Sequence, residues 1–574
     1  MLSLAACGGG GGGNKGGGGN TTVTVSGIVS YEFVPPNFNC NGLNFGGTIT
    51  RPIRGATVQL LDGSGAEIAS ATSSDSGNYS FGSVGINTTV QIRVRAQLDR
   101  TGSPGWDVEV RDNFVENGSD NGVFPPAGLA TRALYTLEGT PFNTGSSNVS
   151  RNLTATTGWD GASYSEPRAA APFAILDTIY SGIQFIQAVD PGVIFPPLDA
   201  FWSVNNTIAS DDVDLTAGQL ATSSYYFGIN SLFILGDATD DTDEFDDHIV
   251  AHEWGHYFED SFSRSDSFGG AHFLGESLTA SLAFGEGWAT ALGAMLLDDP
   301  VYCDTGKPGT TSGGFPYSAE GNSFGVKGWF NEVSVTTFIY DLWDTANDGV
   351  DTGSIGFSPI YDVMTGPQHF SESITTLFSF ASALRDASNS QDAALLDDLL
   401  DRELVVSGIA LDIWGTNETN AAGVPINVKP TVLPLYVDYT ANDPAMEVCV
   451  DSYLDGLDRD GNNIGEDRYM RITVPFDGEY DVSVVTTTMT PATDDPDDRD
   501  QSDPDIYIFR GAGPEFVASG TSGTEGFEPT FRTPTMFAAE TYVAIVEEWR
   551  FDDPEASATY PSTICFDVSF TSTP

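Results

Sequence analysis

The stretch DDHIVAHEWGHYFED, residues 246–260, contains three of the five histidines in a chain of 574 residues. His252 and His256 are four positions apart, so on a helix they lie on one face, one turn from each other. Apolar side chains recur at helical spacing along the stretch, at Ile249, Val250, Trp254 and Tyr257. This pattern predicts a helix. Packing alone does not require such a cluster of histidines, so we interpret the stretch as a functional site.

Two histidines at this spacing suit a zinc ion. Neutral imidazoles one helical turn apart can both reach Zn²⁺ at about 2.0–2.1 Å. Glu253 lies beside them, near enough to a zinc-bound water to take its proton, so the H-E-x-x-H pattern predicts a zinc site with Glu253 as general base. His248 lies one turn before His252 on the same face, and we interpret it as a helix cap or as a residue that supports a ligand.

A catalytic zinc site needs a third protein ligand and one open position. Glu286, in LAFGEGWATALGAMLL (282–297), stands between two glycines at the start of a helix rich in small residues. A buried carboxylate without a partner is costly, and zinc supplies a partner. The sequence therefore predicts His252, His256 and Glu286 as zinc ligands. The alternative is that Glu286 is a solvated residue at a helix N-terminus.

H-E-x-x-H followed by GEGWA resembles the glutamate-zincin clan of metallopeptidases, most closely its fungalysin-like and related secreted bacterial members. The resemblance covers about residues 225–300 well and the rest of 160–440 loosely. It implies that His252, His256 and Glu286 are the ligands and that Glu253 is the general base. It also implies Zn²⁺ as the cofactor and a protein or peptide as the substrate.

The chain departs from these families at two points. They often place an aspartate four residues after the glutamate ligand, where it orients a ligand histidine. Here Thr290 has that position; its hydroxyl accepts the same hydrogen bond more weakly, or Asp260 serves instead. The downstream histidine that usually stabilises the oxyanion has no counterpart at a matching position. Tyr340 and His369 are the candidates for that role, although each is also explained as a structural residue.

The composition limits the class of protein. With 40% hydrophobic and 11% aromatic residues the chain can bury sizeable cores, and its length implies several domains. Its 80 acidic and 23 basic residues give a net charge of −57, which argues against nucleic acid and anionic membrane surfaces as partners. A solvated acidic surface is typical of a protein in saline water, and calcium sites could coexist with it.

One segment has the order of a calcium loop. In DGLDRDGNNIGED, residues 455–467, Asp458, Asp460 and Asn462 are spaced as calcium ligands, but Gly456 stands where the first ligand of an EF-hand loop would be. We interpret the segment first as a turn and second as a Ca²⁺ site.

The cysteines indicate an extracytoplasmic protein. SLAAC, residues 3–7, resembles the lipobox of bacterial lipoproteins, and the glycine-rich stretch after Cys7 suits a flexible tether. Only six residues precede Cys7, fewer than a signal peptide needs, so either the start lies within a longer signal or the match is chance. The resemblance implies a surface lipoprotein of the outer membrane, whose only membrane contact is a lipid at Cys7; the alternative is a secreted protein.

The other four cysteines, an even number, predict two disulfides formed in an oxidising compartment. They are Cys40, Cys303, Cys449 and Cys565. Cys449 and Cys565 bracket one region of the chain and are the more plausible pair.

The fold class expected is multidomain α+β, with a mainly α zincin-like catalytic domain flanked by β-sandwich domains. After a signal remnant and tether (1–20), residues 21–98 resemble a carboxypeptidase-regulatory-like β-sandwich, and 99–159 form a β-rich connection. Residues 160–440 are the expected catalytic domain, and 441–574 resemble a pre-peptidase C-terminal domain. Helices are expected at 166–189, 244–262, 276–297, 333–345, 371–386 and 391–406.

We therefore expect a zinc-dependent endopeptidase acting on extracellular proteins. YYFGINSLFIL (225–235) is predicted to be a strand that, in the resembling families, edges the cleft and pairs with substrate backbone. Related aminopeptidases carry a Gly-x-Met-Glu-Asn stretch that captures the α-amine, whereas GINS (228–231) has no glutamate, leaving the acidic run 240–247 as a substitute. The alternatives are a zinc aminopeptidase of this clan and a non-catalytic surface adhesin containing zinc. The oligomeric state stays open.

Overall fold

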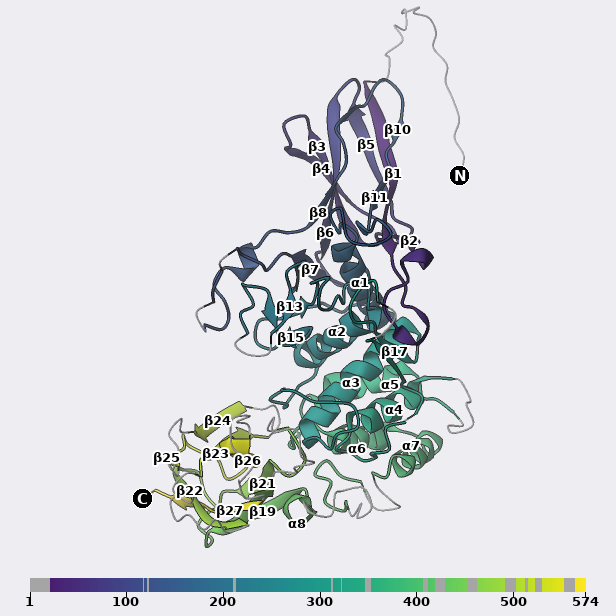
Figure 1. The fold of residues 1–574 in the computed structure, drawn as a ribbon. Coiled ribbons are helices and arrows are strands. Elements are labelled where there is room, and N and C mark those ends of the chain that lie inside the picture. Colours follow the sequence, from purple (N-terminus) through teal and green to yellow (C-terminus); the bar gives the residue numbers. More distant parts are fainter. Residues whose placement is uncertain are drawn as a thin grey trace, which may run out of the picture.

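The computed structural model describes residues 21–116, 118–120, 123–209, 213–310, 313–321, 323–345, 353–405, 411–418, 429–451, 462–490, 502–511, 515–521, 529–551 and 563–573. Within these residues the chain has the expected multidomain α+β architecture: a β-rich N-terminal part, a helical middle and a C-terminal β-sandwich (Figure 1). Cys7, Asp458 and Asp460 lie outside the described residues.

The N-terminal part contains two sheets. The first is centred on β1 (Thr22–Phe33), which pairs with β2 (Ile49–Pro52), β5 (Asn78–Gly85), β10 (Val149–Ser150) and β11 (Leu153–Ala155). The second has the order β15-β16-β12-β7-β6-β3-β4, with β8 and β9 also paired to β6. Its strands are β3 (Ala56–Asp62), β4 (Glu67–Thr72), β6 (Thr89–Arg100), β7 (Trp106–Arg111), β8 (Thr136–Glu138), β9 (Phe142–Asn143), β12 (Leu198–Trp202), β15 (Ser224–Tyr226) and β16 (Ser231–Ile234).

The second sheet connects the N-terminal part to the helical part. Alternate residues of β6 are buried, as expected of a strand with one face on a core. β6 runs past residue 98, and the sheet continues through β7 into the parallel strands β12 and β16 of the region 160–440. One buried hydrophobic cluster includes both Val25 of β1 and Trp254 of the helical part. The two parts therefore share a core.

Helices follow the predicted positions closely. They are α1 (Ala171–Val189), α2 (Asp247–Phe262), α3 (Ala280–Leu297), α4 (Glu332–Trp343), α5 (Phe357–Val363), α6 (Leu377–Ala387), α7 (Ser390–Arg402) and α8 (Lys429–Val432). The six predicted helices are confirmed as α1–α4, α6 and α7. The seven residues of α5 are too few to show a helical period in the sequence.

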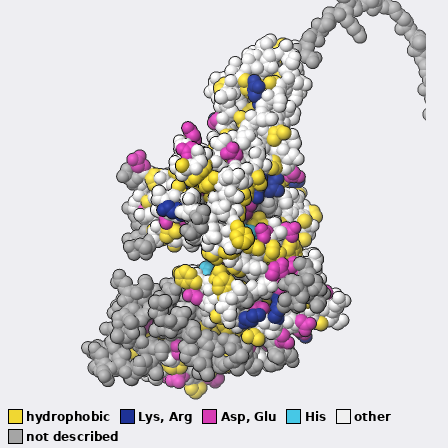
Figure 2. Space-filling model, turned by 45° about the vertical axis from the view of Figure 1, so that its right-hand side comes forward, with side chains coloured by type: hydrophobic (Ala, Val, Ile, Leu, Met, Phe, Trp, Pro, Cys, Tyr) yellow, Lys and Arg dark blue, Asp and Glu magenta, His cyan; other side chains and the backbone are white. Residues whose placement is uncertain are grey.

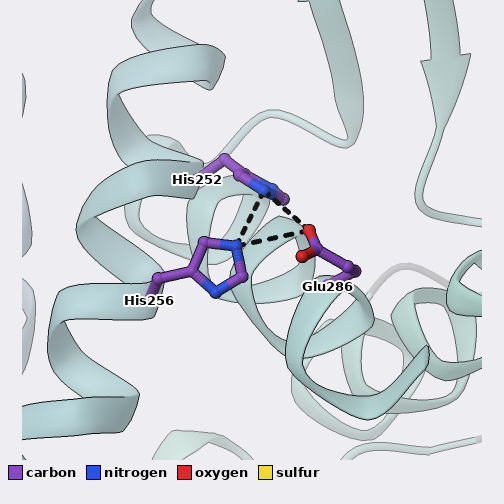
Figure 3. A group of neighbouring side chains, drawn as sticks. All are labelled: His252, His256 and Glu286. Carbon is purple, nitrogen blue, oxygen red and sulfur yellow. Dashed lines mark hydrogen bonds and ion pairs between the residues drawn. The ribbon is translucent and has the colours of Figure 1, made fainter. Parts of the chain in front are cut away.

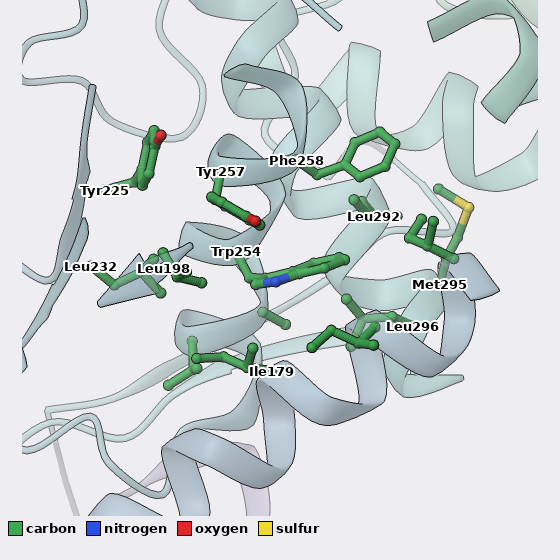
Figure 4. Packing of buried hydrophobic residues seen from close by; sticks show 14 of the residues in the cluster. Ile179, Leu198, Tyr225, Leu232, Trp254, Tyr257, Phe258, Leu292, Met295 and Leu296 are labelled. Atoms are coloured by element: carbon green, nitrogen blue, oxygen red, sulfur yellow. The ribbon is translucent and has the colours of Figure 1, made fainter. Parts of the chain in front are cut away.

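α2 and α3 pack unusually close together. A Cβ at Gly255 of α2 would lie 2.7 Å from Ala289 Cα of α3, so the two backbones meet at this point. Trp254 and Phe258, also on α2, lie in the hydrophobic core near Leu292 of α3 and Ile179 of α1 (Figure 4). Within the described residues, α3 alone is long and apolar enough to cross a membrane, but 89% of it is buried in the protein, which is typical of a core helix.

The prediction of one strand over 225–235 was wrong. The stretch forms a hairpin in which β15 pairs antiparallel with β16 and lies at the edge of the sheet. Gly228 has a φ of 78° and Asn230 a φ of 45° in the turn between them. Glycine and asparagine are the residues that adopt this left-handed conformation most readily, so these two positions turn the chain.

The C-terminal part is a sandwich of two sheets with its own core. The sheets have the orders β19-β21-β26-β23-β24 and β20-β27-β22-β25. The strands are β19 (Tyr436–Thr440), β20 (Met446–Asp451), β21 (Arg468–Thr473), β22 (Tyr480–Thr490), β23 (Pro504–Arg510), β24 (Glu515–Gly520), β25 (Thr530–Arg532), β26 (Tyr542–Glu548) and β27 (Thr563–Ser572).

Both predicted disulfides are present. Cys449 and Cys565 face each other on β20 and β27 and are joined, as expected. Cys40 is joined to Cys303 on β17 (Val301–Asp304), which pairs with β18 (Phe315–Ser318) after the helix α3. The bond between Cys40 and Cys303 thus ties the N-terminal part to the segment that follows α3.

A second small pair of strands, β13 (Thr207–Ile208) and β14 (Gln219–Leu220), precedes β15.

Candidate metal centre

Two neighbouring helices bring the three predicted ligands together. His252 Nε2 lies 3.1 Å from His256 Nε2, and both nitrogens face Glu286 Oε2, at 3.1 and 3.3 Å respectively (Figure 3). The histidines come from successive turns of α2 and the glutamate from the second turn of α3. The close approach of the helices at Gly255 is what allows a side chain of α3 to reach both rings.

The chemistry and spacing of these atoms fit a zinc ion. Ligands about 2.0–2.1 Å from a tetrahedral zinc ion are themselves about 3.3–3.4 Å apart, close to the 3.1–3.3 Å separations of this group. Two imidazole nitrogens and one carboxylate oxygen are a common ligand set for catalytic zinc. All three side chains are mostly buried, so one divalent cation would compensate a carboxylate that is otherwise enclosed.

Thr290 supports His252 from behind. Its Oγ1 lies 2.9 Å from Nδ1 of His252, so the ring can donate there while Nε2 faces the centre. Asp260, the other residue predicted for this role, instead accepts a hydrogen bond from the Tyr225 hydroxyl at 2.7 Å. Of the two candidates, Thr290 makes the contact.

Glu253 is buried beside the centre and held by the edge strand. Its Oε2 accepts a hydrogen bond from the backbone N–H of Tyr225 in β15 at 2.6 Å. Burial raises the pKa of Glu253 to about 7, although the charge of His252 acts to lower it. A carboxyl group with such a pKa can accept and return a proton near neutral pH, which is what a general base requires.

The sequence reasoning missed two residues at the centre. His272, in the loop between α2 and α3, places Nε2 3.3 Å from Glu286 Oε2 and 3.6 Å from Glu332 Oε2. The side chain of His272 is 27% exposed, against 13% and 11% for His252 and His256, so it is the most accessible of the three. The scarcity of histidine, which singled out the helix, could also have singled out His272. Nothing in the sequence pattern marks Glu332.

The remaining predicted residues have structural positions. His248 is buried, and its Nε2 donates to the carbonyl oxygen of Asp299 at 3.3 Å. Tyr340 packs against Trp343 within α4, and His369 Nδ1 donates to the carbonyl oxygen of Ser263. Neither histidine belongs to a group of metal-ligand atoms among the described residues.

Part of the centre is open to solvent. In Figure 2 histidine side-chain atoms reach the surface on the left of the view. The side chain of His272 is 27% exposed, so the centre is accessible on the side of this residue.

One comparison with known proteins supports a peptidase-like domain in this part of the chain. Residues 198–400 match the family model of the mycolysin C-terminal domain, and this range contains all the residues of the centre. Among solved structures the chain is similar to the pre-peptidase C-terminal domain of a collagenase from Bacillus anthracis. The identity is 7%, the likeness covers 24% of this chain and 93% of that chain, and the TM-score is 0.15. A search of curated proteins gives no match.

Proposed function

We propose that this chain is a zinc-dependent endopeptidase of the glutamate-zincin type, fungalysin-like, that hydrolyses peptide bonds of extracellular proteins. The observation that carries the proposal is the meeting of His252, His256 and Glu286 at 3.1–3.3 Å beside the buried carboxylate of Glu253. The match of residues 198–400 to a peptidase family domain supports the same class of activity.

In the proposed mechanism His252, His256 and Glu286 hold the zinc ion. When bound, the ion supplies Lewis acidity, which polarises a peptide carbonyl and makes a water molecule more acidic. Glu253 accepts the proton of the attacking water and then donates it to the leaving amine. The hydrogen bond from Tyr225 N–H fixes one oxygen of Glu253, which leaves the other oxygen for this transfer. Thr290 fixes the ring of His252 in the same way.

His272 is our candidate for the group that stabilises the oxyanion. Its Nε2 faces the centre, and its side chain is more accessible than those of the two ligand histidines. A hydrogen-bond donor aimed at the oxygen on which charge develops lowers the barrier of acyl transfer. Glu332 lies 3.6 Å from the same nitrogen and positions the ring.

The edge strand β15 supports cleavage inside chains. The N–H of Tyr225 donates to Glu253, so the outer edge of β15 faces the helix that carries the centre. An extended peptide added to such an edge is bound through its main chain, whichever residues it contains. This mode of binding does not require a chain end.

The aminopeptidase alternative rests on Glu332. This buried carboxylate belongs to the group of acidic and histidine side chains around Glu286, where it could bind a free α-amine. Its engagement by His272 makes it less available for that purpose. In the adhesin alternative zinc is only structural, and the position of Glu253 would then have no role.

We further propose that the protein acts outside the cytoplasm, either secreted or attached through a lipid on Cys7. Its two disulfides form in oxidising compartments. A net charge of −57 argues against binding to nucleic acid.

The test uses the purified full chain. Elemental mass spectrometry measures its zinc content, and a peptide library measures its hydrolytic activity. We expect one zinc ion per chain, cleavage at internal bonds, loss of cleavage after chelation and recovery with zinc. A chain that binds zinc and cleaves no peptide would favour the adhesin. A chain that lacks zinc would overturn the proposal.

A further inference from the structure

A second group of carboxylates lies away from the three zinc-ligand candidates. Asp241 and Asp243 belong to the loop before α2, and Asp304 is the last residue of β17. Each offers one carboxylate oxygen, and the three oxygens lie within 4.8 Å of one another. Asp246, directly before α2, adjoins the group, because its Oδ2 accepts hydrogen bonds from N–H and Oγ1 of Thr305 at 2.9 and 3.0 Å.

Two of these carboxylates are buried with an oxygen that has no partner. Asp243 is 4% exposed and Asp246 is 3% exposed. Oδ2 of Asp243 accepts a hydrogen bond from Ser223 Oγ at 2.5 Å, but Oδ1 of Asp243 and Oδ1 of Asp246 have no hydrogen-bond partner among the described residues. Burying a carboxylate oxygen without a compensating partner is costly.

The four carboxylates also repel one another. After burial, the charges that act most strongly on Asp243 are those of Asp241, Asp246 and Asp304, and together these effects raise its pKa well above the usual value. Asp304 and Asp241 act on Asp246 in the same direction. Four acids from two distant segments therefore lie together in one place, where their charges must be neutralised, either by protons or by a cation.

The basic side chains nearby are paired with other acids. Arg168 forms a buried ion pair with Glu244, and Arg51 pairs with Asp247 at 2.9 Å. Across the part of the chain that the structure describes, no ion pair is formed by the four clustered aspartates. The compensating charge does not come from these arginines.

We propose that Asp241, Asp243 and Asp304 bind one calcium ion, with Asp246 beside it. A set of carboxylate oxygens suits a hard cation such as Ca²⁺. Zinc prefers sites that contain thiolate or imidazole ligands. Oxygens on opposite sides of Ca²⁺ are about 4.6–5.2 Å apart, so one ion reaches three oxygens that lie within 4.8 Å of one another. Mg²⁺ gives up its water reluctantly, which disfavours it where several buried carboxylates replace water. This inference does not depend on the proposed peptidase activity.

The ion would join three segments around the catalytic helix. Asp241 and Asp243 hold the loop that leads into α2, and Asp304 holds the end of β17. Through its hydrogen bond to Ser223, Asp243 also holds the residue just before β15. Loss of the ion should therefore loosen both the edge strand and the start of the helix that carries His252.

The test is a calorimetric titration of the metal-stripped full chain, reloaded with zinc, using Ca²⁺ alone as the probe. We expect one binding site, a melting temperature that rises with Ca²⁺, and at least tenfold weaker binding in Asp243→Asn and in Asp304→Asn. Asp237→Asn is the matched control, because Asp237 lies on the same loop but its Oδ1 accepts from Thr239 instead. Zinc content is measured in every sample, so a failure of the zinc centre is recognised separately.

Absence of Ca²⁺ binding to the original chain, or equal binding in both cluster variants and the control, would overturn the proposal. Stronger binding of Mg²⁺ than of Ca²⁺ would overturn the choice of ion. If the variants fail to fold, terbium luminescence of the unaltered chain decides. The charges of Asp304 and Asp243 both raise the pKa of Tyr302, so this ring lies near the cluster and should sensitise bound Tb³⁺. Ca²⁺ should displace Tb³⁺ and abolish the luminescence. No signal, or no displacement, would contradict a site at this place.

Discussion

The backbone N–H of Tyr225 donates a hydrogen bond to Glu253 Oε2 at 2.6 Å, and this contact joins the edge strand β15 to the helix α2. The proposed general base is thus held by the same strand to which we expect the substrate to bind. Binding and proton transfer depend on one local arrangement, because displacement of the strand would also release the carboxylate.

Glu253→Gln should keep the zinc and lose the activity. The amide has the size of the carboxylate and leaves all three ligands in place, but it cannot accept the proton of water. We expect hydrolysis to fall by roughly a hundred- to ten-thousand-fold, measured with a quenched fluorescent peptide at equal zinc content. Glu166→Gln, which removes the same charge from an exposed position, is the control. Near-normal activity of Glu253→Gln would remove this residue from the mechanism.

Thr290→Val should weaken the zinc site without removing a ligand. Valine has the shape of threonine but cannot receive the hydrogen bond from His252 Nδ1, which spans 2.9 Å. Loss of such a supporting contact lowers metal affinity or activity by roughly 10- to 100-fold. A competition titration with a zinc-binding dye measures the affinity, and Thr290→Ser, which keeps the hydroxyl, should behave like the original chain. Equal affinity in both variants would show that the contact has no such role.

His272→Gln should separate a role in the reaction from a role in metal binding. If His272 stabilises the oxyanion, kcat should fall by roughly 100-fold or more while zinc content and KM change little. His369→Gln is the matched control, since that histidine contacts the carbonyl oxygen of Ser263 and belongs to no ligand group in the described structure. Loss of zinc in His272→Gln would instead identify His272 as a ligand.

Blocking the amino terminus of a peptide should not prevent cleavage. An endopeptidase that binds substrate along β15 should give internal fragments from an acetylated peptide and from its unblocked copy, as read by mass spectrometry. Removal of single residues from only the unblocked copy would indicate an aminopeptidase. In that case Glu332→Gln should abolish the trimming, because it removes the carboxylate that would bind the α-amine.

A chain that begins at residue 160 should fold poorly. β12 pairs with β7 (Trp106–Arg111), and Cys303 is joined to Cys40, so the shortened chain would lose both a sheet neighbour and a disulfide. Loss of a native disulfide typically costs about 2–5 kcal/mol. Melting followed by circular dichroism, with a chain that begins at residue 21 as the control, measures the effect. Equal melting temperatures would show that the shared sheet contributes little.

The sequence predicted the helices and the proposed ligands because each depends on a local pattern. His252 and His256 lie one turn apart by helical geometry alone, and the apolar residues around them identify the buried face. Glu286 was identified by a carboxylate among small apolar residues. These features are contained within single segments, so no knowledge of the tertiary structure was needed.

The features that were missed depend on contacts between distant segments. His272 lies in the loop between α2 and α3 and Glu332 at the start of α4, so the two are brought together only by the tertiary structure. The carboxylates of Asp241 and Asp304 come together through the fold, and the acidic composition of the chain concealed them. The hairpin at 225–235 was read as one strand because its turn residues, Gly228 and Asn230, stand among apolar ones.

The contact between Gly255 and Ala289 sets the distance between α2 and α3 at the centre. Two of the proposed ligands lie on α2 and the third on α3, and a Cβ at Gly255 would meet the backbone of Ala289 first, at 2.7 Å from its Cα. The distance between the ligands on α2 and the ligand on α3 is therefore set by the backbones of the two helices. The methyl group of an alanine at position 255 would increase this distance. The close contact at Gly255 therefore requires glycine at this position if the distances between the three proposed ligands are to stay the same.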